Sequence, residues 1–402
     1  NIVCGPEEPE SGLPARVRLQ YNLGDATPVT ILRRSLDARR KNRVVYRYRV
    51  CVEVSDDEAG RLLVMPDIAE YRAPETLSKA RPARDLSVLV VGAGPAGLFG
   101  ALRLAGAGAD VTIVERGRGV EERMEDIGAL ERDGVLNPES NVLFGEGGAE
   151  AYSDGKLTTR IRKPEIEYFL RSLIEFGAPP EIAYETRPHL GTDRLRAMLE
   201  NMRSRLTERG VRILFRVKAV DLVVSSGMVR GIVTSDGNEI TADAVLLATG
   251  HSARDVYGML HRRGVALEQK GFAVGTRVEH PSELVNFMQY GRAALRHNLP
   301  PADYFLAYND PASGLGVYTF CMCPGGEVVN SSSEHGALCV NGMSYSARDG
   351  AFSNAAVVVT VKPERLAAGP LAGVDFQRMI EERAFVLGGG NFTAPAQTVE
   401  SF

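Results

Sequence analysis

The chain has 402 residues, of which 44% are apolar and 24% are charged, and its formal net charge is −4. This length predicts two or three domains, and the near-balance of charge excludes a general attraction to nucleic acid or to anionic membranes. No apolar run approaches the roughly 18 residues of a membrane span. The five cysteines are odd in number and scattered, which excludes a secreted disulfide framework and predicts a reducing, cytoplasmic compartment.

Residues 1–80 predict a small N-terminal α+β domain. RVRLQYNL (Arg16–Leu23) and RVVYRYRVCVEV (Arg43–Val54) alternate like half-buried strands, and residues 27–41 between them have the length of a short helix. The domain is locally basic through Arg33, Arg34, Arg39, Arg40, Lys41, Arg43, Arg47 and Arg49. We expect a solvated face, or one that docks on an acidic face of the same protein. An RNA-binding module is the alternative, although no stacking aromatics form a recognised motif. Prolines and mixed charge predict a linker at Ala73–Asp85.

The clearest pattern in the chain is a strand, a glycine-rich turn, a small-residue helix and a second strand. The apolar run Val88–Val91 predicts a buried parallel strand, and DVTIVE, which ends at Glu115, predicts its neighbour. Between the two strands Gly92, Gly94 and Gly97 form GxGxxG at the start of the helix. This arrangement is the fingerprint of dinucleotide binding.

Each residue of the fingerprint has its own physical role. Gly92 permits the tight turn, Gly94 lets the backbone approach a pyrophosphate, and Gly97 lets the helix and strand pack closely. The helix N-terminus faces the phosphates, and Glu115 can accept hydrogen bonds from the adenosine ribose. A glycine-rich turn without a ligand is the alternative, which the flanking strands and the acid disfavour.

The region that follows favours FAD over a simple NAD dehydrogenase. Val217–Gly250 predicts three short strands joined by Ser-Ser-Gly and Asp-Gly-Asn turns, and then a buried strand that ends in Ala248-Thr249-Gly250. Such a meander resembles the FAD domain of glutathione-reductase-like flavoproteins. A dithiol reductase of that kind would carry a second GxGxxG and a Cys-x4-Cys pair, and the sequence has neither; LGGGN at Leu387–Asn391 lacks the spacing.

Further stretches along the chain resemble one family. They are FGEGGAEAYSDGKLTTRI (Phe144–Ile161), RPHLGTDRL (Arg187–Leu195), GHSARDVY (Gly250–Tyr257), FCMCPGGEVVNSSSEHG with VNGMSYSARDG (from Phe320), and FTAPAQ (from Phe392). Over essentially its whole length the chain resembles the uncharacterised FAD-dependent, or NAD(FAD)-utilising, dehydrogenases among glutathione-reductase-like flavoproteins. The resemblance implies FAD as the cofactor, with NAD(P)H as an open second one, and it leaves the substrate undefined.

The chain departs from the family pattern in two places. Ala149-Glu150-Ala151-Tyr152 stands where the pattern runs Ala-Gly-Thr-Phe, so a carboxylate beside the expected flavin loop either alters the substrate or caps a turn. Such flavoproteins also return to the FAD domain with a Gly-Asp or Gly-Glu motif, whereas this sequence reaches AQTVESF before one. We expect residues 386–402 to begin that return, so that the element either lies beyond Phe402 or is absent.

By resemblance, the loop Gly145–Leu157 wraps the flavin pyrophosphate and ribityl chain with its backbone N–H groups and Lys156, while a surface turn is the alternative. Together, the fingerprint and the resemblance imply these cofactor contacts: Gly92, Gly94, Pro95, Ala96, Gly97, Glu115, Arg116, Gly147, Gly148, Ser153, Asp154, Gly155, Lys156, Leu157, Thr249, Gly250, Pro324, Gly325 and Gly326.

Polar residues at the ends of predicted elements are the candidates for acid–base chemistry. Thr192 or Asp193 suits the N-cap of a helix, which leaves Arg187 and His189 to reach the flavin or a substrate anion. His251 follows the Ala-Thr-Gly strand, at the carboxyl end of a parallel sheet, and there it either exchanges protons or caps the turn. The catalytic candidates are His251, His189, Tyr318, Cys321 and Cys323.

The pair Cys321 and Cys323 stands one residue apart before a Pro-Gly-Gly turn. No metal site is predicted, because a site would need about four soft ligands and the other cysteines offer no second pair. A disulfide between residues i and i+2 of an extended segment would be strained. We expect two thiols on one face of a strand end as pocket lining, with a redox-active thiol and plain core cysteines as alternatives. By resemblance, Pro324–Gly326 brings backbone close to the isoalloxazine ring or the substrate.

These patterns together predict an α/β fold. It has a Rossmann-type, glutathione-reductase-like FAD-binding domain with a β-meander at residues 86–255, and a β-rich substrate domain at residues 256–385 with strands FAVGTRVEH, GVYTFCMC, EVVNSS and AAVVVTVK. The predicted function is a FAD-dependent dehydrogenase that transfers hydride between an unidentified small-molecule substrate and flavin N5. The alternatives are a flavin monooxygenase or oxidase, an RNA-directed flavoprotein that docks through its basic segment, and a flavin-binding protein without turnover. The electron acceptor and the oligomeric state stay open.

Overall fold

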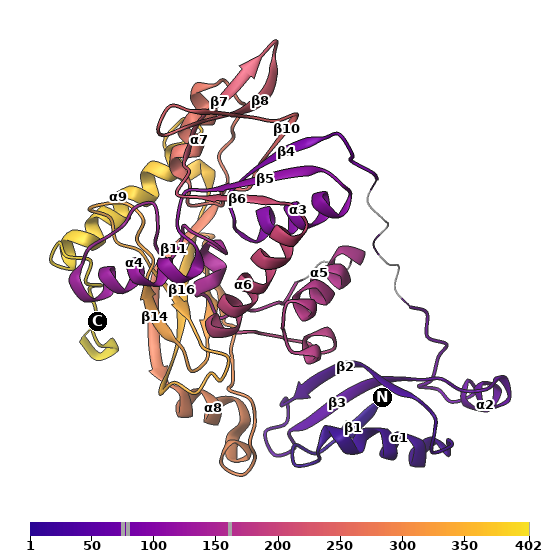
Figure 1. Ribbon diagram of the computed structural model, residues 1–402. Coiled ribbons are helices and arrows are strands. Elements are labelled where there is room, and N and C mark those ends of the chain that lie inside the picture. The colour runs from indigo at the N-terminus through magenta and orange to yellow at the C-terminus, as the bar shows by residue number, and fades with distance from the viewer. Residues whose placement is uncertain (74–76, 78–80, 160–162, 402) are drawn as a thin grey trace.

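The computed structural model describes residues 1–73, 77, 81–159 and 163–401 (Figure 1). The described chain forms a small N-terminal unit, a central unit around a parallel sheet, and a β-rich unit followed by a long helix. Residues 74–76 and 78–80 of the predicted linker lie outside the described residues. Within the described ranges, no helix has both the length and the apolar content that crossing a bilayer requires.

The N-terminal unit is a three-stranded antiparallel sheet in the order β1-β3-β2, accompanied by two helices. Its elements are β1 (Ile2–Cys4), α1 (Leu13–Tyr21), β2 (Val29–Asp37), β3 (Val45–Val52) and α2 (Asp56–Leu62). The strand predicted within Arg43–Val54 is confirmed. The other two predictions are wrong, because the first predicted strand belongs to helix α1 and the predicted helix is strand β2.

Burial explains both corrections. Leu13 and Val17 stand one helical turn apart and are both buried, so that one face of α1 fills the core of this unit. The predicted strand began at Arg16, after Leu13, and therefore missed this helical spacing. In β2, Val29 and Ile31 pack on the same core from alternate positions of a segment whose β-branched residues favour an extended backbone.

The N-terminal unit contacts the central unit through strand β2. Arg34 forms an ion pair with Glu185, and its backbone N–H donates to Tyr184 O at 2.7 Å. The N–H of Thr186 donates to Arg34 O at 2.9 Å, and Arg33 Nε donates to Thr186 Oγ1 at 3.1 Å. Two arginines of the basic segment therefore dock on the same protein, in line with one of the two readings expected for that segment.

The central unit is built around a four-stranded parallel sheet in the order β10-β4-β5-β6, which lies in the upper part of the view in Figure 1. Its strands are β4 (Ser87–Val91), β5 (Asp110–Glu115), β6 (Arg212–Phe215) and β10 (Ala244–Leu247). The strands predicted at Val88–Val91, at DVTIVE and before Ala248 are confirmed. Val90 and Ile113 are both 0% exposed, as expected where both faces of a parallel sheet are covered.

Alternate residues of β4 face two separate cores. Val88 and Val90 pack against α3 (Pro95–Gly106) and α6 (Thr192–Glu208), together with α5 (Pro164–Glu175). Leu89 and Val91 pack on the opposite face, against the antiparallel meander and helix α7. The elements on that face are β7 (Ala219–Ser225), β8 (Met228–Thr234), β9 (Glu239–Thr241) and α7 (Arg254–Arg262). The predicted three-stranded meander is thus confirmed, and it covers one face of the sheet.

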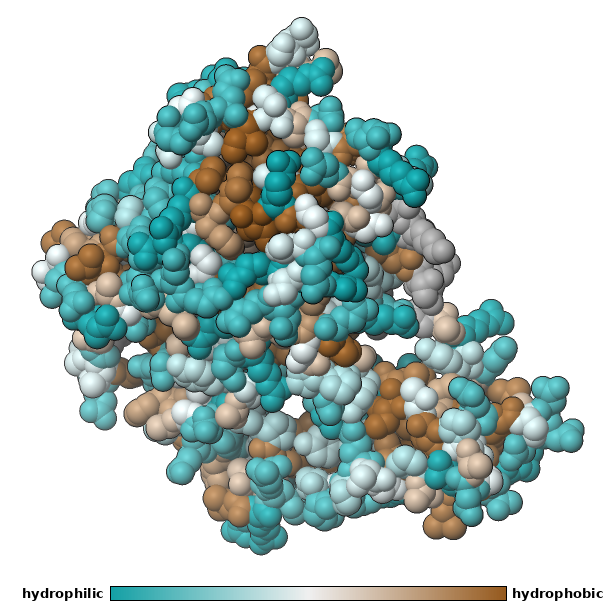
Figure 2. Space-filling view, viewed as in Figure 1, coloured by the Kyte–Doolittle hydropathy of each residue, from teal (hydrophilic) through white to brown (hydrophobic). Residues whose placement is uncertain are grey.

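Apolar side chains gather at the top of the view in Figure 2, where Figure 1 places β7, β8 and β10. Among them Val224 of β7 is 48% exposed and Leu246 of β10 is 37% exposed. The edge of the central sheet in this region is therefore less fully covered than its middle.

The β-rich unit is an antiparallel sheet in the order β11-β16-β13-β12 beside the hairpin β14-β15. Its strands are β11 (Phe272–Pro281), β12 (Ala307–Asn309), β13 (Gly316–Cys323), β14 (Glu327–Asn330), β15 (Val340–Met343) and β16 (Phe352–Val361). All four strand segments predicted for this unit are confirmed. Two helices, α8 (Ser282–Tyr290) and α9 (Ala372–Leu387), accompany them.

Helix α9 brings the chain back beside the central unit (Figure 1). Arg254 at the start of α7 makes an ion pair with Glu381 of α9 at 2.6 Å. Beyond α9, Asn330 Nδ2 donates to Phe392 O at 2.8 Å. The segment predicted to begin the return thus contacts the β14 hairpin, after a helix that itself contacts the central unit through Arg254.

Candidate cofactor and active site

The turn between β4 and α3 has the geometry of a phosphate-binding turn. Gly92 has a φ of +107°, and a Cβ there would lie 2.4 Å from Ala248 O. A Cβ on Gly97 would lie 1.9 Å from Gly92 O, so that close packing of helix on turn also requires glycine. At Gly94, by contrast, Gly148 Cα is the one described atom that a Cβ would meet within 4 Å, at 4.0 Å. The space in front of Gly94 is therefore free of described protein, at a helix N-terminus whose N–H groups suit a phosphate.

Glu115 ends β5 beside this turn and is 5% exposed. Its carboxylate accepts backbone N–H groups from Ala93 at 2.7 Å, Gly117 at 3.0 Å and Gly145 at 3.0 Å. A carboxylate offers about four acceptor positions, so Glu115 ties the turn to the glycine loop and retains capacity for a further donor. Its contact with a ribose stays a prediction.

A polar cavity of about 250 Å³ lies beyond the end of β5. The Arg116 guanidinium stands 4.4 Å from the Phe144 ring centroid and pairs with Asp255 at 3.0 Å. Lys218 Nζ pairs with Glu139 at 2.7 Å on the same wall. An aromatic ring beside two cations suits a flat, electron-rich base joined to phosphates.

Arg123 of α4 (Val120–Asp133) holds the glycine loop in place and is 0% exposed. Its guanidinium donates to four backbone oxygens, those of Asn141 (2.7 Å), Val142 (2.9 Å), Glu146 (2.6 Å) and Gly148 (2.8 Å). Charge-assisted bonds of this number fix the loop firmly. Sequence reasoning missed Arg123, because nothing in VEERMED distinguishes it from its exposed charged neighbours.

Asp154 is the centre of a buried charge cluster that joins the glycine loop to the β-rich unit. Only 2% of its surface is exposed, and it accepts from Ser344 Oγ and from Arg348, whose Nε lies 3.0 Å away. Lys156 Nζ lies 2.9 Å from Asp154 Oδ2 and also donates to Met322 O. Burial alone would raise the pKa of Asp154, but Lys156 and Arg348 outweigh it and hold that pKa below its usual range. Sequence reasoning quoted the stretch that holds Ser344 and Arg348 without assigning either residue to the site.

His189 lies at the edge of this cluster. It forms an isolated β-bridge with Lys156, and its Nε2 lies 3.2 Å from Ser346 O. Burial lowers the pKa of His189 and the charge of Arg348 lowers it further, so the imidazole is neutral at pH 7. Donation from Nε2–H to Ser346 O leaves Nδ1 as a proton acceptor.

The predicted side-chain N-cap at Thr192 or Asp193 is wrong. The N-cap of α6 is Gly191, with a φ of +82° and no side-chain hydrogen bond. Thr192 Oγ1 donates to Ala151 O at 2.6 Å, and Asp193 accepts from the N–H and the hydroxyl of Ser346 at 2.7 Å each. Both side chains therefore tie α6 to neighbouring loops instead of closing its first turn.

Cys321 and Cys323 interrupt the regular strand end that was predicted for them. The pairing of β13 with β16 shifts register between Phe320 and Cys323, and Cys321 has a left-handed φ of +46°. All five cysteines are free, and Cys323 is 0% exposed. A hydrogen bond from the Cys323 thiol lowers the pKa of Cys321 to about 6, and the cations Lys156 and Arg277 also favour the thiolate while burial opposes it. The same hydrogen bond raises the pKa of Cys323.

The Pro324–Gly326 turn is buried against protein backbone. A Cβ on Gly325, whose φ is +53°, would lie 1.9 Å from Arg348 O, and a Cβ on Gly326 would lie 2.3 Å from Met343 O. Packing on the loop after β15 therefore explains both glycines. A contact between this turn and the flavin stays a prediction.

The remaining catalytic candidates are His251 and Tyr318. His251 is exposed and follows Gly250, whose φ is +75°, on the side of the glycine turn. A Cβ on Gly92 would lie 3.3 Å from Thr249 Cα, which places Thr249 beside that turn as predicted. Tyr318 sits inside β13, paired with Ala307 and Val358. The structure thus brings His189 and the two cysteines to the lysine but leaves the roles of His251 and Tyr318 as predictions.

The described part of the chain holds no group of three or more His, Cys, Asp or Glu side chains arranged to bind a metal ion. The donors of the site are instead backbone N–H groups at a helix start and the cations Arg116, Lys156 and Lys218. Such a donor set suits a phosphate-bearing organic cofactor.

Models of protein families match three parts of the chain. Residues 85–150 match the FAD binding domain, and residues 271–402 match the domain described as FAD-dependent protein, C-terminal domain-like. Residues 1–53 match a domain of unknown function. The first match covers the glycine turn and the first six residues of the loop Gly145–Leu157, so the turn whose geometry fits a pyrophosphate is that of an FAD site. FAD is the cofactor.

An uncharacterised protein of Clostridium beijerinckii is 44% identical to the chain over 389 residues, which are 96% of this chain and 73% of that protein. Among solved structures, the glycerol-3-phosphate dehydrogenase of Bacillus halodurans, complexed with FAD, is similar over 79% of this chain and 55% of its own, at 13% identity and a TM-score of 0.34. The THI4 protein of Thermovibrio ammonificans is similar over 46% of this chain and 66% of its own, at 22% identity and a TM-score of 0.31. The chain thus spans less than two thirds of each of these solved proteins.

Proposed function

We propose that this chain, which belongs to the same family as the Clostridium beijerinckii relative and matches two models of FAD-dependent domains, is an FAD-dependent dehydrogenase acting on a small molecule. The observation that carries the proposal is the space at Gly94, which leaves the start of α3 open to a pyrophosphate beside the matched FAD-binding turn. The meander β7-β8-β9 ahead of β10 supports the glutathione-reductase-like variant of the fold.

Three parts of the site would hold FAD: the first turn of α3, the polar cavity beyond β5 and the loop that contains Lys156. The first turn of α3 would receive the pyrophosphate, and Arg116 and Lys218 in the polar cavity would receive the adenosine end. The loop that contains Lys156 would receive the flavin end. Bound FAD supplies a hydride acceptor at flavin N5.

The chain's own residues position this loop and provide acid–base groups. The salt bridges from Asp154 to Lys156 and Arg348 tie the glycine loop to the β-rich unit, which would carry the substrate side of the site. His189 is neutral at pH 7 with Nδ1 available to take a proton, so it is the base that the geometry favours. Cys321, with a pKa of about 6, is a second ionisable group beside the same lysine.

The basic segment bears on the RNA-directed alternative. Arg34 has two carboxylate partners within the protein, Glu10 and Glu185, and Arg39 and Arg47 both pair with Asp37. Arginines that are neutralised within the protein have less charge to offer to phosphates. These ion pairs favour an internal docking role for the segment, and RNA binding remains the weaker proposal.

The test is the absorbance spectrum of the purified protein, followed by anaerobic addition of NADH and then NADPH. We expect the bands of oxidised flavin and their bleaching by one of the two nucleotides or by an organic donor. Re-oxidation in air at a rate that matches turnover would favour an oxidase or monooxygenase instead. A colourless protein that takes up no added FAD would refute the proposal.

A further inference from the structure

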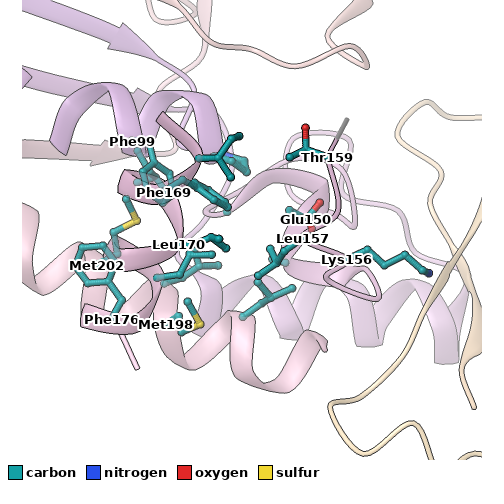
Figure 3. A pocket seen from close by; sticks show the side chains of 18 of the residues that line it. Phe99, Glu150, Lys156, Leu157, Thr159, Phe169, Leu170, Phe176, Met198 and Met202 are labelled. Atoms are coloured by element: carbon teal, nitrogen blue, oxygen red, sulfur yellow. The ribbon is translucent and has the colours of Figure 1, made fainter. Parts of the chain in front are cut away.

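A partly open apolar cavity of about 330 Å³ lies among α3, α5 and α6 (Figure 3). Apolar side chains of these helices, and of the residue directly after α5, form much of its wall: Phe99, Phe169, Leu170, Phe176, Met198 and Met202. Protein interiors are close-packed, so an apolar space of this size between well-packed helices is unusual unless a ligand fills it. Methionines also adapt their shape readily to apolar ligands.

The polar residues of the cavity come from one segment of the chain. Glu150, Lys156, Thr158 and Thr159 lie on its rim. Lys156 extends away from the apolar side chains toward Met322, to whose carbonyl oxygen it donates. Burial raises the pKa of Glu150, and the neighbouring Cys321 and Asp154 raise it further when they are ionised. Glu150 offers carboxyl oxygens that can accept a hydrogen bond from a ligand hydroxyl or amino group, whereas Lys156 is turned away from any ligand carboxylate in the cavity.

The cavity also extends to the glycine turn and the glycine loop. Pro95, the first residue of α3, and Gly147 of the glycine loop are part of its wall. A molecule in the cavity would thus lie beside the turn that receives the pyrophosphate, with its polar end toward the segment that includes Lys156.

We propose that this cavity binds the apolar body of the substrate, and that the substrate is a hydrophobic alcohol or amine whose hydroxyl or amino group donates to Glu150. The inference rests on the proposed function and adds the class of substrate. A hydrophobic wall supplies affinity through the area that it removes from water, and one polar contact at the rim fixes orientation.

The test uses the FAD-loaded protein and the fluorescence of 1-N-phenylnaphthylamine, which rises in apolar sites. We expect saturable binding that 1-decanol and decylammonium displace, with decanoate about tenfold weaker because its carboxylate has no donor for Glu150 and loses water without a cation to pair with. Leu170→Trp fills the cavity and should weaken binding of the probe by about tenfold. Glu175→Trp, on the exposed side of the same helix, should leave it unchanged. Met202→Phe adds less volume and replaces Leu170→Trp if that variant does not fold.

The role of the rim carboxylate is tested separately. Glu150→Gln should reduce the preference for 1-decanol over decanoate to less than about threefold, while Glu165→Gln, an exposed control on α5, should retain it. Equal displacement by 1-decanol and decanoate in the unaltered protein would overturn the inference, and so would unchanged probe binding in both cavity-filling variants.

Flavin absorbance, recorded on every sample, separates this inference from the proposed function. Probe binding to the FAD-free protein that disappears on loading with FAD would assign the cavity to the cofactor, overturning the inference and leaving the proposed function intact. A protein that takes up no FAD would instead refute the proposed function, whatever the probe does.

Discussion

Two alanine substitutions in one turn separate cofactor binding from folding. Gly94 and Gly97 are three residues apart, and the structure gives them opposite surroundings. Gly94 has φ −76° and ψ 179°, an extended backbone that alanine adopts without strain, and it faces open space. Gly97 faces the carbonyl oxygen of Gly92 at a distance that no Cβ tolerates.

The expected magnitudes differ accordingly. Gly94→Ala should change the free energy of unfolding of the FAD-free protein by no more than about 0.5 kcal/mol. Its methyl group would stand where the pyrophosphate approaches, so the affinity for FAD should fall by about tenfold or more, equivalent to about 1.4 kcal/mol. Gly97→Ala should destabilise the FAD-free protein by about 1–3 kcal/mol or more, because the Cβ would lie 1.9 Å from a backbone oxygen of a fixed turn.

Urea unfolding followed by far-ultraviolet circular dichroism measures the first quantity, and quenching of FAD fluorescence on titration measures the second. Gly12→Ala is the matched control, because a Cβ there meets no described atom within 4 Å and the residue belongs to the N-terminal unit. Wild-type affinity for FAD in Gly94→Ala would show that no phosphate approaches this turn. Wild-type stability in Gly97→Ala would show that helix and turn are not packed as described.

Three further outcomes are expected. Asp154→Asn should lower the free energy of unfolding at pH 7 by about 3–5 kcal/mol, because a buried ion pair loses one partner. Since the pKa of Asp154 is lowered by folding, this difference should shrink as urea unfolding is repeated below the unfolded pKa of about 3.9. Alkylation of Cys321 by iodoacetamide, followed by peptide mass spectrometry, should be half-maximal near its pKa of about 6, with Cys323 protected; half-maximal labelling above pH 8 would contradict this. Arg34→Met should cost about 1.5–3 kcal/mol in urea unfolding, because this arginine is 23% exposed and has two carboxylate partners. Arg39→Met, where the side chain is 82% exposed, should leave the urea midpoint essentially unchanged, and equal effects of the two would refute the docking role.

The parts of the fold that sequence predicted correctly are those whose pattern is complete within a short window. Val88–Val91 is buried on both faces, so it is a continuous apolar run, and the fingerprint beside it is contiguous. The N-terminal unit gives such a signal only in the strand within Arg43–Val54. Its helix α1 buries Leu13 and Val17 at a spacing that a strand-like reading from Arg16 onward does not include, and the arginines of β2 resemble those of an exposed helix.

The candidate site shows the same difference between local patterns, which the sequence reveals, and contacts between distant segments, which it does not. The positions of the glycine turn and Glu115 follow from one segment of about thirty residues, as is typical of a βαβ unit. Asp154 and Arg348, by contrast, are 194 positions apart, and no local pattern pairs a carboxylate with an arginine across that distance. Arg123 was missed for a related reason, since its partners are backbone carbonyls, which have no signature in the sequence.

The non-local contacts also explain how the glycine loop and the β-rich unit are held together. Lys156 belongs to the loop, but its ammonium group is held by Asp154 and by Met322 O of β13. Arg277 of β11 holds the neighbouring carbonyl, that of Cys321, at 3.2 Å. A shift of β13 would therefore move two groups at once. One is Met322 O, which holds Lys156, and the other is the Cys321 thiol, whose ionised form Lys156 stabilises. Ionisation of Cys321 and the position of the loop are linked by that geometry, so a change in either one should alter the other.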